Sequence, residues 1–322
     1  MAVILLVCIV AAGSVTAWFL TRDDSPDFCR ELASDSRVEP ILAAAHGREV
    51  DCATLGRTLK GATTGRIAEK HSLKQAQAMK NTLLAIDDRM QKLGVTSLDA
   101  EFSTALADAL VDYPSDIYGS LAPSEFDHWN HNFPWDPPWE EDGGVHMAVP
   151  EKPLMRVMRG LSATPSAYAE LRLAVTRSAA HELATTPDST NHSVIAAAPK
   201  TNARALAALD AIADNVTGSL GKEQAADWKN RVFTRLTQVS GSVPPYDKDP
   251  EHNITGTWQK DLKSAGNGDL SASLYGQGPV LVKVWGKGNL LKEEQISSLA
   301  DDARFSAESA RITWAHNLEQ WQ

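Results

Sequence analysis

The sequence predicts a mainly α-helical fold: a helical bundle with one long irregular loop rich in proline and tryptophan, and one small β-hairpin before the C-terminal helix. Two observations lead to this prediction. Apolar residues recur every three or four positions through most of the chain, which is the period of amphipathic helices. Between residues 114 and 153 that period is lost, and seven prolines gather there with five phenylalanine and tryptophan residues. Long irregular segments of this kind are usually functional or linkers.

The first segment, residues 1–21, is predicted to be a transmembrane anchor or a signal segment. No charged side chain occurs in residues 2–20, and a helix of about 20 apolar residues crosses the roughly 30 Å hydrocarbon core of a bilayer. The residues up to Ala17 also fit a signal-peptide cleavage site, although a basic n-region is missing. A buried helix is a third interpretation. The first two place residues 22–322 outside the cytoplasm, on a single-pass membrane protein or on a secreted one.

Residues 22–113 are predicted to form a helical unit tied by a disulfide bond. Cys29 and Cys52 are the only two cysteines after the apolar start. In an exported chain such a pair indicates one disulfide. In a cytoplasmic chain the two residues would be unrelated thiols.

Amphipathic helices are predicted on both sides of the irregular loop. Gly94 and Pro114 are typical residues to end two helices before the loop, and Thr164 with Pro165 is a typical start of a helix after it. Alanines in the apolar seam of the last helix allow close contact with a neighbour. Two short helices are expected within 22–52, and longer ones over 67–93, 98–113, 202–216, 221–239 and 292–320.

The C-terminal bundle, residues 154–322, is predicted to contain the β-hairpin at about 270–285. Residues 280–285 (VLVKVW) are rich in β-branched side chains, and the Gly-Gln-Gly-Pro before them suits a turn after a first strand at 270–275. An isolated hairpin is only marginally stable, so this one is expected to pack on helices.

The net charge of −10 is concentrated in one part of the chain. Residues 93–151 contain twelve acidic residues and no lysine or arginine, so the rest of the chain has 31 basic and 29 acidic residues. Nucleic acid is therefore excluded as a partner, because phosphate binding needs a basic surface. The acidic stretch suits a cation or a basic protein surface. Alternatively, it is a solvated face that keeps the protein soluble.

The irregular loop contains the best candidates for a metal site. Two histidines three residues apart can share a face, and carboxylates can complete a nitrogen and oxygen shell for zinc or calcium. In the other interpretation these histidines form hydrogen bonds inside a packed aromatic loop. The predicted ligands are His128, His131 and His146, with Glu140, Glu141 and Asp142 as the neighbouring acids.

Three tryptophans of the same loop, Trp129, Trp135 and Trp139, are candidates for ligand stacking. Indole faces pack on the apolar faces of sugars, but tryptophans in a proline-rich loop also pack on their own domain. No catalytic residue is predicted. The acidic series Glu101, Asp108, Asp112 and Asp116 is assigned to the solvated face of a helix rather than to paired catalytic carboxylates.

Two stretches resemble a known group of proteins. Residues 108–118 (DALVDYPSDIY) and 145–171 (VHMAVPEKPLMRVMRGLSATPSAYAEL) are similar to a helical region of uncharacterised actinobacterial proteins associated with type VII-like secretion. The similarity covers residues 98–220. It implies an all-helical, non-enzymatic protein that is extracytoplasmic or linked to secretion. It carries no functional residue over to this chain.

The sequence therefore predicts a non-enzymatic interaction protein, anchored in the membrane or secreted, that acts outside the cytoplasm. Its partner would be a protein or a component of the cell envelope, as in an envelope or secretion assembly. The alternative is a cell-wall-active hydrolase, metal-dependent or not, or a glycan-binding protein that uses residues 125–146.

Overall fold

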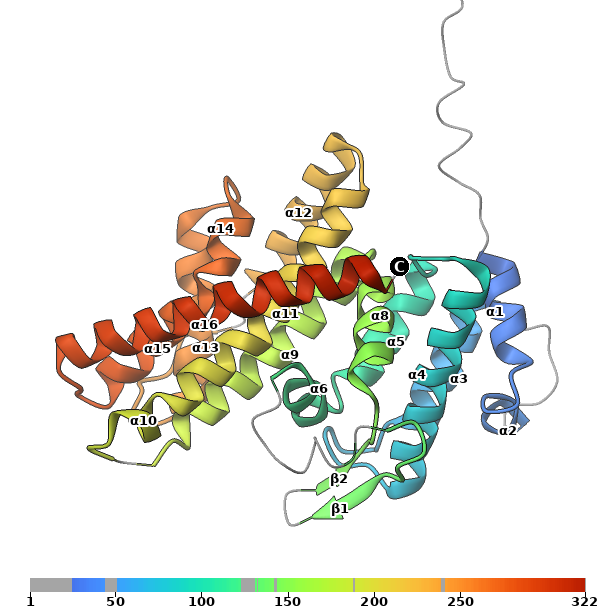
Figure 1. Cartoon of the computed structure of the whole chain (residues 1–322), viewed down its shortest axis with the longest axis horizontal. Helices are drawn as coiled ribbons and strands as arrows, with labels where there is room; N and C mark the ends of the chain where they lie inside the picture. The colour runs from blue at the N-terminus through green and yellow to red at the C-terminus, as the bar shows by residue number, and fades with distance from the viewer. Residues whose placement is uncertain are drawn as a thin grey trace, which may run out of the picture.

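The computed structural model of the chain confirms the mainly α-helical fold (Figure 1). The structure describes residues 25–43, 51–122, 131, 133–141, 144–187, 189–238 and 241–321. In this part of the chain, no helix combines the length and the apolar character that crossing a membrane requires. Residues 2–20, the predicted anchor, lie outside the described residues.

The N-terminal helices form the right-hand part of Figure 1, drawn from blue to teal. A disulfide bond joins Cys29 to Cys52, with 5.3 Å between the Cα atoms, as the sequence predicts. It ties the first helix to the start of the third. The helices are α1 (Ser25–Ala33), α2 (Glu39–Leu42), α3 (Cys52–Thr63), α4 (Leu73–Leu93) and α5 (Ala100–Leu110).

Local capping determines where α4 begins and ends. The Ser72 side chain accepts a hydrogen bond from the Gln75 backbone, and the Gln75 side chain accepts one from Ser72 N, which is a capping box. Gly94 ends the helix in the left-handed conformation, with φ +64°. The predicted start at residue 67 is wrong, because residues 67–70 form a turn in front of the capping box.

The segment 114–153, predicted to be irregular throughout, contains regular structure at both ends. Helix α6 (Pro114–Leu121) starts at Pro114, which is favourable at the first helical position because it has no N–H to satisfy there. The strands β1 (Trp139–Glu141) and β2 (Gly144–His146) pair antiparallel, with Trp139 opposite His146. They form the only sheet in the part of the chain that the structure describes.

The C-terminal helices pack as a bundle in which α16 lies along α11 (Figure 1). Helix α9 packs in the same bundle, where it contacts α11, α12 and α13. Most of the predicted seam of the last helix is buried, including Leu299, Ala303 and Trp314. The helices are α8 (Glu151–Ser162), α9 (Pro165–Ala184), α10 (His192–Ile195), α11 (Ala197–Ser219), α12 (Lys222–Leu236), α13 (Pro250–Ala265), α14 (Leu270–Tyr275), α15 (Gln277–Gly288) and α16 (Glu293–Gln320).

The predicted β-hairpin at 270–285 is wrong, because this segment forms the helices α14 and α15. In a strand, Leu281, Lys283 and Trp285 would share one face. In the helix, Leu281 and Trp285 are buried one turn apart, while Lys283 points to solvent. The helix-propensity cost of three valines is a few tenths of a kcal/mol each, whereas burying a large apolar side chain stabilises by about 1.5–3 kcal/mol.

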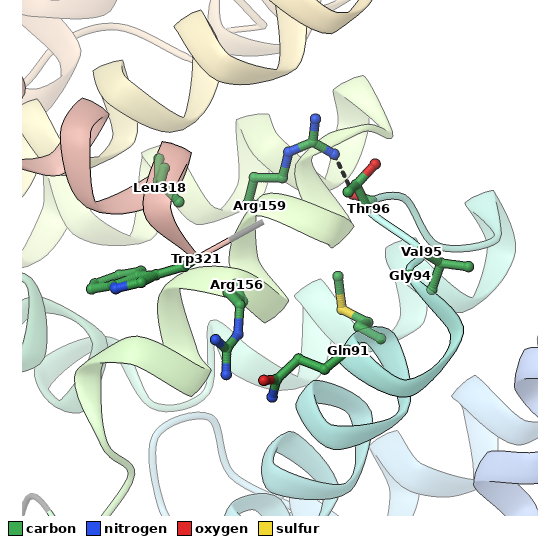
Figure 2. Close-up of a pocket in the computed structure, with 9 residues that line it drawn as sticks. Gln91, Gly94, Val95, Thr96, Arg156, Arg159, Leu318 and Trp321 are labelled. Carbon is green, nitrogen blue, oxygen red and sulfur yellow. Dashed lines mark hydrogen bonds between the residues drawn. The ribbon is translucent and has the colours of Figure 1, made fainter.

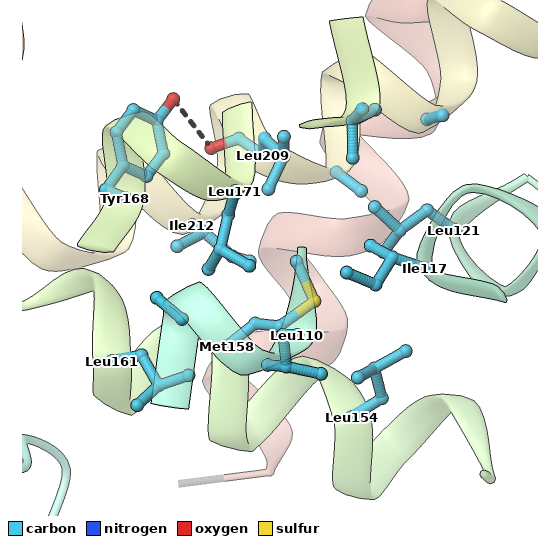
Figure 3. Packing of buried hydrophobic residues seen from close by; sticks show 14 of the residues in the cluster. Leu110, Ile117, Leu121, Leu154, Met158, Leu161, Tyr168, Leu171, Leu209 and Ile212 are labelled. Atoms are coloured by element: carbon cyan, nitrogen blue, oxygen red, sulfur yellow. Dashed lines mark hydrogen bonds between the residues drawn. The ribbon is translucent and has the colours of Figure 1, made fainter. Parts of the chain in front are cut away.

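One contiguous apolar core connects the N-terminal and C-terminal helices. Figure 3 shows its centre, where Leu110 of α5 and Ile117 of α6 point toward Met158 of α8 and Leu171 of α9. The Tyr168 hydroxyl donates a hydrogen bond to the Leu209 carbonyl at 3.3 Å, which satisfies a buried polar group in this core (Figure 3). Helices α5 and α6 are thus held rigidly, and α6 forms one wall of the cleft described below.

A buried network of polar side chains connects α9, α11, α14 and α15. The Arg172 guanidinium, with no exposed surface, lies 2.5 Å from Asp210 Oδ1. Arg172 also donates to Gln277 Oε1 at 2.8 Å and to the Leu274 carbonyl at 3.0 Å. Gln277 in turn donates to Thr176 Oγ1 at 2.8 Å. These bonds fix the first turn of α15 on α9.

We expect the stability of the protein to fall between about pH 4 and pH 2, partly because of Asp35. Hydrogen bonds from the Arg37 side chain lower the pKa of Asp35 from 3.8 to about 2. The unfolded chain therefore takes up a proton before the folded chain does, so this stabilisation is present above pH 4 and is lost as the pH falls to 2. Thermal unfolding of the Asp35→Asn variant checks it: its deficit relative to the native chain should shrink toward pH 2, and a pH-independent deficit would contradict the assignment.

Candidate functional site

A cleft of about 440 Å³ is the candidate functional site. Its walls come from five separate parts of the chain: the turn before α4, the start of α6, the hairpin β1–β2, the second half of α9 and the start of α13. In Figure 1 the hairpin lies below α6. The volume lies within the usual range for small-molecule sites, which is about 300–1,000 Å³.

His146 is fixed between two carboxylates at one end of the cleft. Its Nδ1 lies 2.7 Å from Asp116 Oδ1, and its Nε2 lies 3.1 Å from Glu141 Oε1. Asp116 is 1% exposed and also accepts a hydrogen bond from Met147 N at 3.1 Å. The sequence assigned Asp116 to a solvated helix face, and this is wrong because α6 turns the carboxylate inward to bind the hairpin.

Asp112, also assigned to a solvated face, is 8% exposed and holds the turn before α4. Its Oδ1 accepts from Glu69 N at 2.6 Å and its Oδ2 from Gly65 N at 3.3 Å. A Cβ on Gly65 would lie 1.7 Å from the Lys70 carbonyl oxygen, so only glycine fits there. Glu69 adopts φ +61°, a left-handed conformation that non-glycine residues rarely adopt.

His71 contributes a polar atom that has no hydrogen-bond partner among the described residues. Its side chain is 5% exposed, and its ring packs on Tyr113 with 3.8 Å between the centroids. Its Nε2 lies 2.5 Å from the Val145 carbonyl, which can only accept, so Nε2 carries a proton. Its Nδ1 is buried, accepts no hydrogen bond from the part of the chain that the structure describes, and lies 3.8 Å from Asp112 Oδ2. When the ring is neutral, His71 Nδ1 and Asp112 Oδ2 are therefore two hydrogen-bond acceptors that face each other.

The charges of the cleft are mostly negative. Helix α9 supplies Arg177 and His181, and His181 Nδ1 lies 3.2 Å from Glu251 Oε2 on α13. Arg177 is the only lysine or arginine among the lining residues, which all belong to the described part of the chain. Five carboxylates line the same space, those of Glu69, Asp112, Glu141, Glu182 and Glu251. This composition suits a ligand that carries a cationic group.

The structure places the predicted metal ligands as follows. His131 and His146 both stack on the Trp139 ring, with centroid distances of 4.3 Å and 4.9 Å. His128 and Asp142 lie outside the described residues. Among the residues that the structure does describe, no group of three or more histidine, cysteine, aspartate or glutamate side chains is arranged to hold a metal ion. The zinc or calcium site stays a prediction.

The tryptophans proposed for stacking have different surroundings. Trp129 lies outside the described residues, and Trp139 packs on the two imidazoles. Trp135 is 76% exposed and stacks on Phe133, with 5.0 Å between the centroids and 8° between the planes. The buried Lys80 ammonium donates to the Asp136 carbonyl and holds this part of the loop on α4. The role of Trp135 and Trp139 in ligand stacking stays a prediction.

His71, Glu69 and Arg177 belong to no motif in the sequence that predicts a site. The Ser72 to Gln75 capping box is the signal that bears on the first two, because it places residues 65–71 outside the helix. Arg177 carries no signal of its own, since an arginine in an amphipathic helix is ordinarily solvent-exposed.

A second, smaller cavity of about 70 Å³ lies between α4, α8 and the end of α16 (Figure 2). Arg156 and Arg159 line it, but both are already bound within the protein. Arg156 makes two hydrogen bonds to Asp87, at 2.5 Å and 2.6 Å. Arg159 donates to the Thr96 carbonyl, as Figure 2 shows, and to Asn215 Oδ1 at 2.8 Å. These guanidinium groups stabilise the packing of α8, so the larger cleft is the better candidate.

Comparison with known proteins gives no relative from which a role could be transferred. No protein-family model matches the chain, and the searches against curated proteins and against solved structures found no match.

Proposed function

We propose that this chain is a non-enzymatic interaction protein that acts outside the cytoplasm and binds a cationic group of its partner in the acidic cleft. The observation that carries the proposal is the lining of the cleft, which has five carboxylates and one guanidinium. The partner is a protein or envelope component that presents a lysine-like or arginine-like side chain, as part of an envelope or secretion assembly.

The disulfide bond supports the proposed compartment. Disulfides persist in oxidising surroundings and are rare in the cytosol, and Cys29 and Cys52 are joined in this chain. Residues 2–20 would anchor the protein in the membrane, or would be removed by cleavage near Ala17 to release it.

Several titratable groups of the cleft already contact other residues of the protein, and this favours a binding role over a catalytic one. His146 contacts Asp116 and Glu141 with its two nitrogens, and Asp112 holds the turn before α4. These groups maintain the shape of the cleft. The Glu69 carboxylate is exposed and makes no hydrogen bond or ion pair with any residue that the structure describes, so it remains available to a ligand.

Calorimetric titration of the full-length chain with Nα-acetyl-L-lysine methylamide tests the proposal. We expect saturable binding that weakens as salt is added, because part of the attraction is between exposed charges. The Glu69→Gln variant should bind about fivefold more weakly, since an exposed charge pair contributes up to about 1 kcal/mol.

Two controls make this titration specific. The norleucine analogue of the ligand, which lacks the ammonium, should not bind. The Glu308→Gln variant removes an exposed acid from α16, far along the chain from the cleft lining, and should bind like the native chain. Equal affinities for the lysine and norleucine ligands, or no binding of either, would refute the proposal.

A hydrolase is the second candidate, and the pair of Asp116 and His146 is the observation that favours it. A buried carboxylate 2.7 Å from an imidazole nitrogen can orient the ring for general acid–base catalysis. Release of soluble fragments from purified cell wall by the native chain, with loss in His146→Gln, would support this candidate. An inactive native chain would exclude it for that substrate.

A further inference from the structure

The cleft also contains one positive side chain among the negative groups that dominate its lining. Arg177 lies on α9, one helical turn before His181, and is half-buried. Unlike the other arginines described above, it makes no hydrogen bond or ion pair with any described residue. A half-buried guanidinium without a carboxylate is unusual, because the charge has lost part of its hydration without compensation.

The start of α6 lies in the same cleft. Pro114 and Ser115 line it, and the N-cap residue Tyr113 provides no side-chain hydrogen bond to the first turn. The first turn of a helix presents N–H groups and a partial positive charge. Arg177 and this helix start are both positive features of the lining, and both suit a carboxylate.

The opposite character belongs to the turn before α4. Glu69 is held at φ +61°, where glycine would be accommodated more easily, and its carboxylate pairs with none of the residues that the structure describes. Beside it, the buried His71 Nδ1 and Asp112 Oδ2 face each other at 3.8 Å, and when the ring is neutral no described residue places a proton donor between them. An ammonium group has three N–H donors, so a single group can donate to both the Glu69 and the Asp112 carboxylates at this turn.

We infer that the ligand of the cleft is zwitterionic: a chain end that carries a side-chain ammonium group and a free α-carboxylate on one residue. The carboxylate binds Arg177 of α9 and the first turn of α6, and the ammonium binds Glu69 and Asp112. This inference rests on the proposed function, in which the cleft binds a cation, and adds the requirement for a free carboxylate. It selects the terminus of a peptide rather than a lysine within a continuous chain.

The test compares three ligands on the full-length chain by calorimetry. Nα-acetyl-L-lysine carries both charges, its methylamide carries only the ammonium, and Nα-acetyl-L-norleucine carries only the carboxylate. We expect Nα-acetyl-L-lysine to bind at least tenfold more tightly than either of the other two.

The Arg177→Gln variant tests whether Arg177 binds the ligand carboxylate or only maintains the shape of the cleft. It should reduce the affinity for Nα-acetyl-L-lysine to that for the methylamide, and leave the affinity for the methylamide unchanged. The Arg304→Gln variant, which removes an arginine that is 63% exposed on α16, should change neither affinity.

A Glu69→Gly variant guards against loss of folding as the explanation for weak binding. Because glycine adopts a positive φ at lower cost, this variant should unfold at a higher temperature than the native chain and yet bind both lysine ligands more weakly. An unchanged or lower midpoint together with native affinity would overturn the role of Glu69.

The outcomes distinguish this inference from the proposed function. If the acid and the methylamide bind equally well, the inference is wrong and the proposed function stands. If Arg177→Gln lowers the affinity for both lysine ligands by the same factor, Arg177 only maintains the shape of the cleft and the inference is wrong. If neither lysine ligand binds, both proposals are wrong.

Discussion

Replacing Arg172 by leucine is expected to lower the free energy of unfolding by about 3–5 kcal/mol, which is the usual cost of removing one partner of a buried ion pair. Arg172 has no exposed surface, and its partner Asp210 is 3% exposed. Without the guanidinium, the Asp210 carboxylate, the Gln277 amide and the Leu274 carbonyl would each lose a hydrogen-bond partner. Urea unfolding followed by circular dichroism measures the effect.

The double variant Arg172→Leu/Asp210→Leu tests the cause of this loss. Replacing both members of a buried pair by apolar residues is often neutral or stabilising, so the double variant should be more stable than the single one. Arg304→Leu, at an exposed ion pair, should change stability by less than about 0.5 kcal/mol. A single variant as stable as the native chain would mean that the network does not hold α15 on α9.

Removing the disulfide bond with Cys29→Ser/Cys52→Ser is expected to destabilise the protein by about 3 kcal/mol. The bond closes a loop of 24 residues, from 29 to 52, and chain-entropy estimates give about 3 kcal/mol for a loop of this size. The loss should be seen in denaturant unfolding as a lower midpoint with a similar slope.

Treatment with a reducing agent provides the matched control for this prediction. It should lower the stability of the native chain to that of the double variant and have no further effect on the variant. Equal stability of the oxidised and reduced native chains would show that the bond contributes nothing, and it would remove one support for the proposed oxidising compartment.

Several features of the fold were predictable from local sequence alone. Gly94 ends α4 in the left-handed conformation, and Pro165 begins α9 after Thr164. Helix α16, with its apolar seam, spans Glu293–Gln320, almost the whole range predicted for it. These signals depend only on residues within one or two turns of each other, because capping and helical period are local properties. The pairing of Cys29 with Cys52 followed from the apolar start, which indicates export, and from the presence of only two cysteines after it.

The conformation of residues 270–288 could not be read from the same signals. Valines and glycines there suit a strand and a turn by local preference, but Gln277 bonds to Arg172, which is 105 residues away in sequence. Gly278 also lies close to Ala203 of α11, where an added Cβ would be 3.4 Å from the Ala203 side chain. Contacts between distant helices outweigh local propensities of a few tenths of a kcal/mol.

The sequence by itself determined the helical class, several helix ends, the disulfide and the acidic character of residues 93–151. The tertiary structure decided which acids serve the site. Asp112 and Asp116 lie on one continuous acidic stretch, yet the packing of α5 and α6 turns both inward against the turn before α4 and the hairpin. The same packing brings Glu69, His146 and Arg177 to one cleft. Helical period and capping reach only a turn or two along the chain, whereas a binding site is formed by side chains that the core brings together from distant segments.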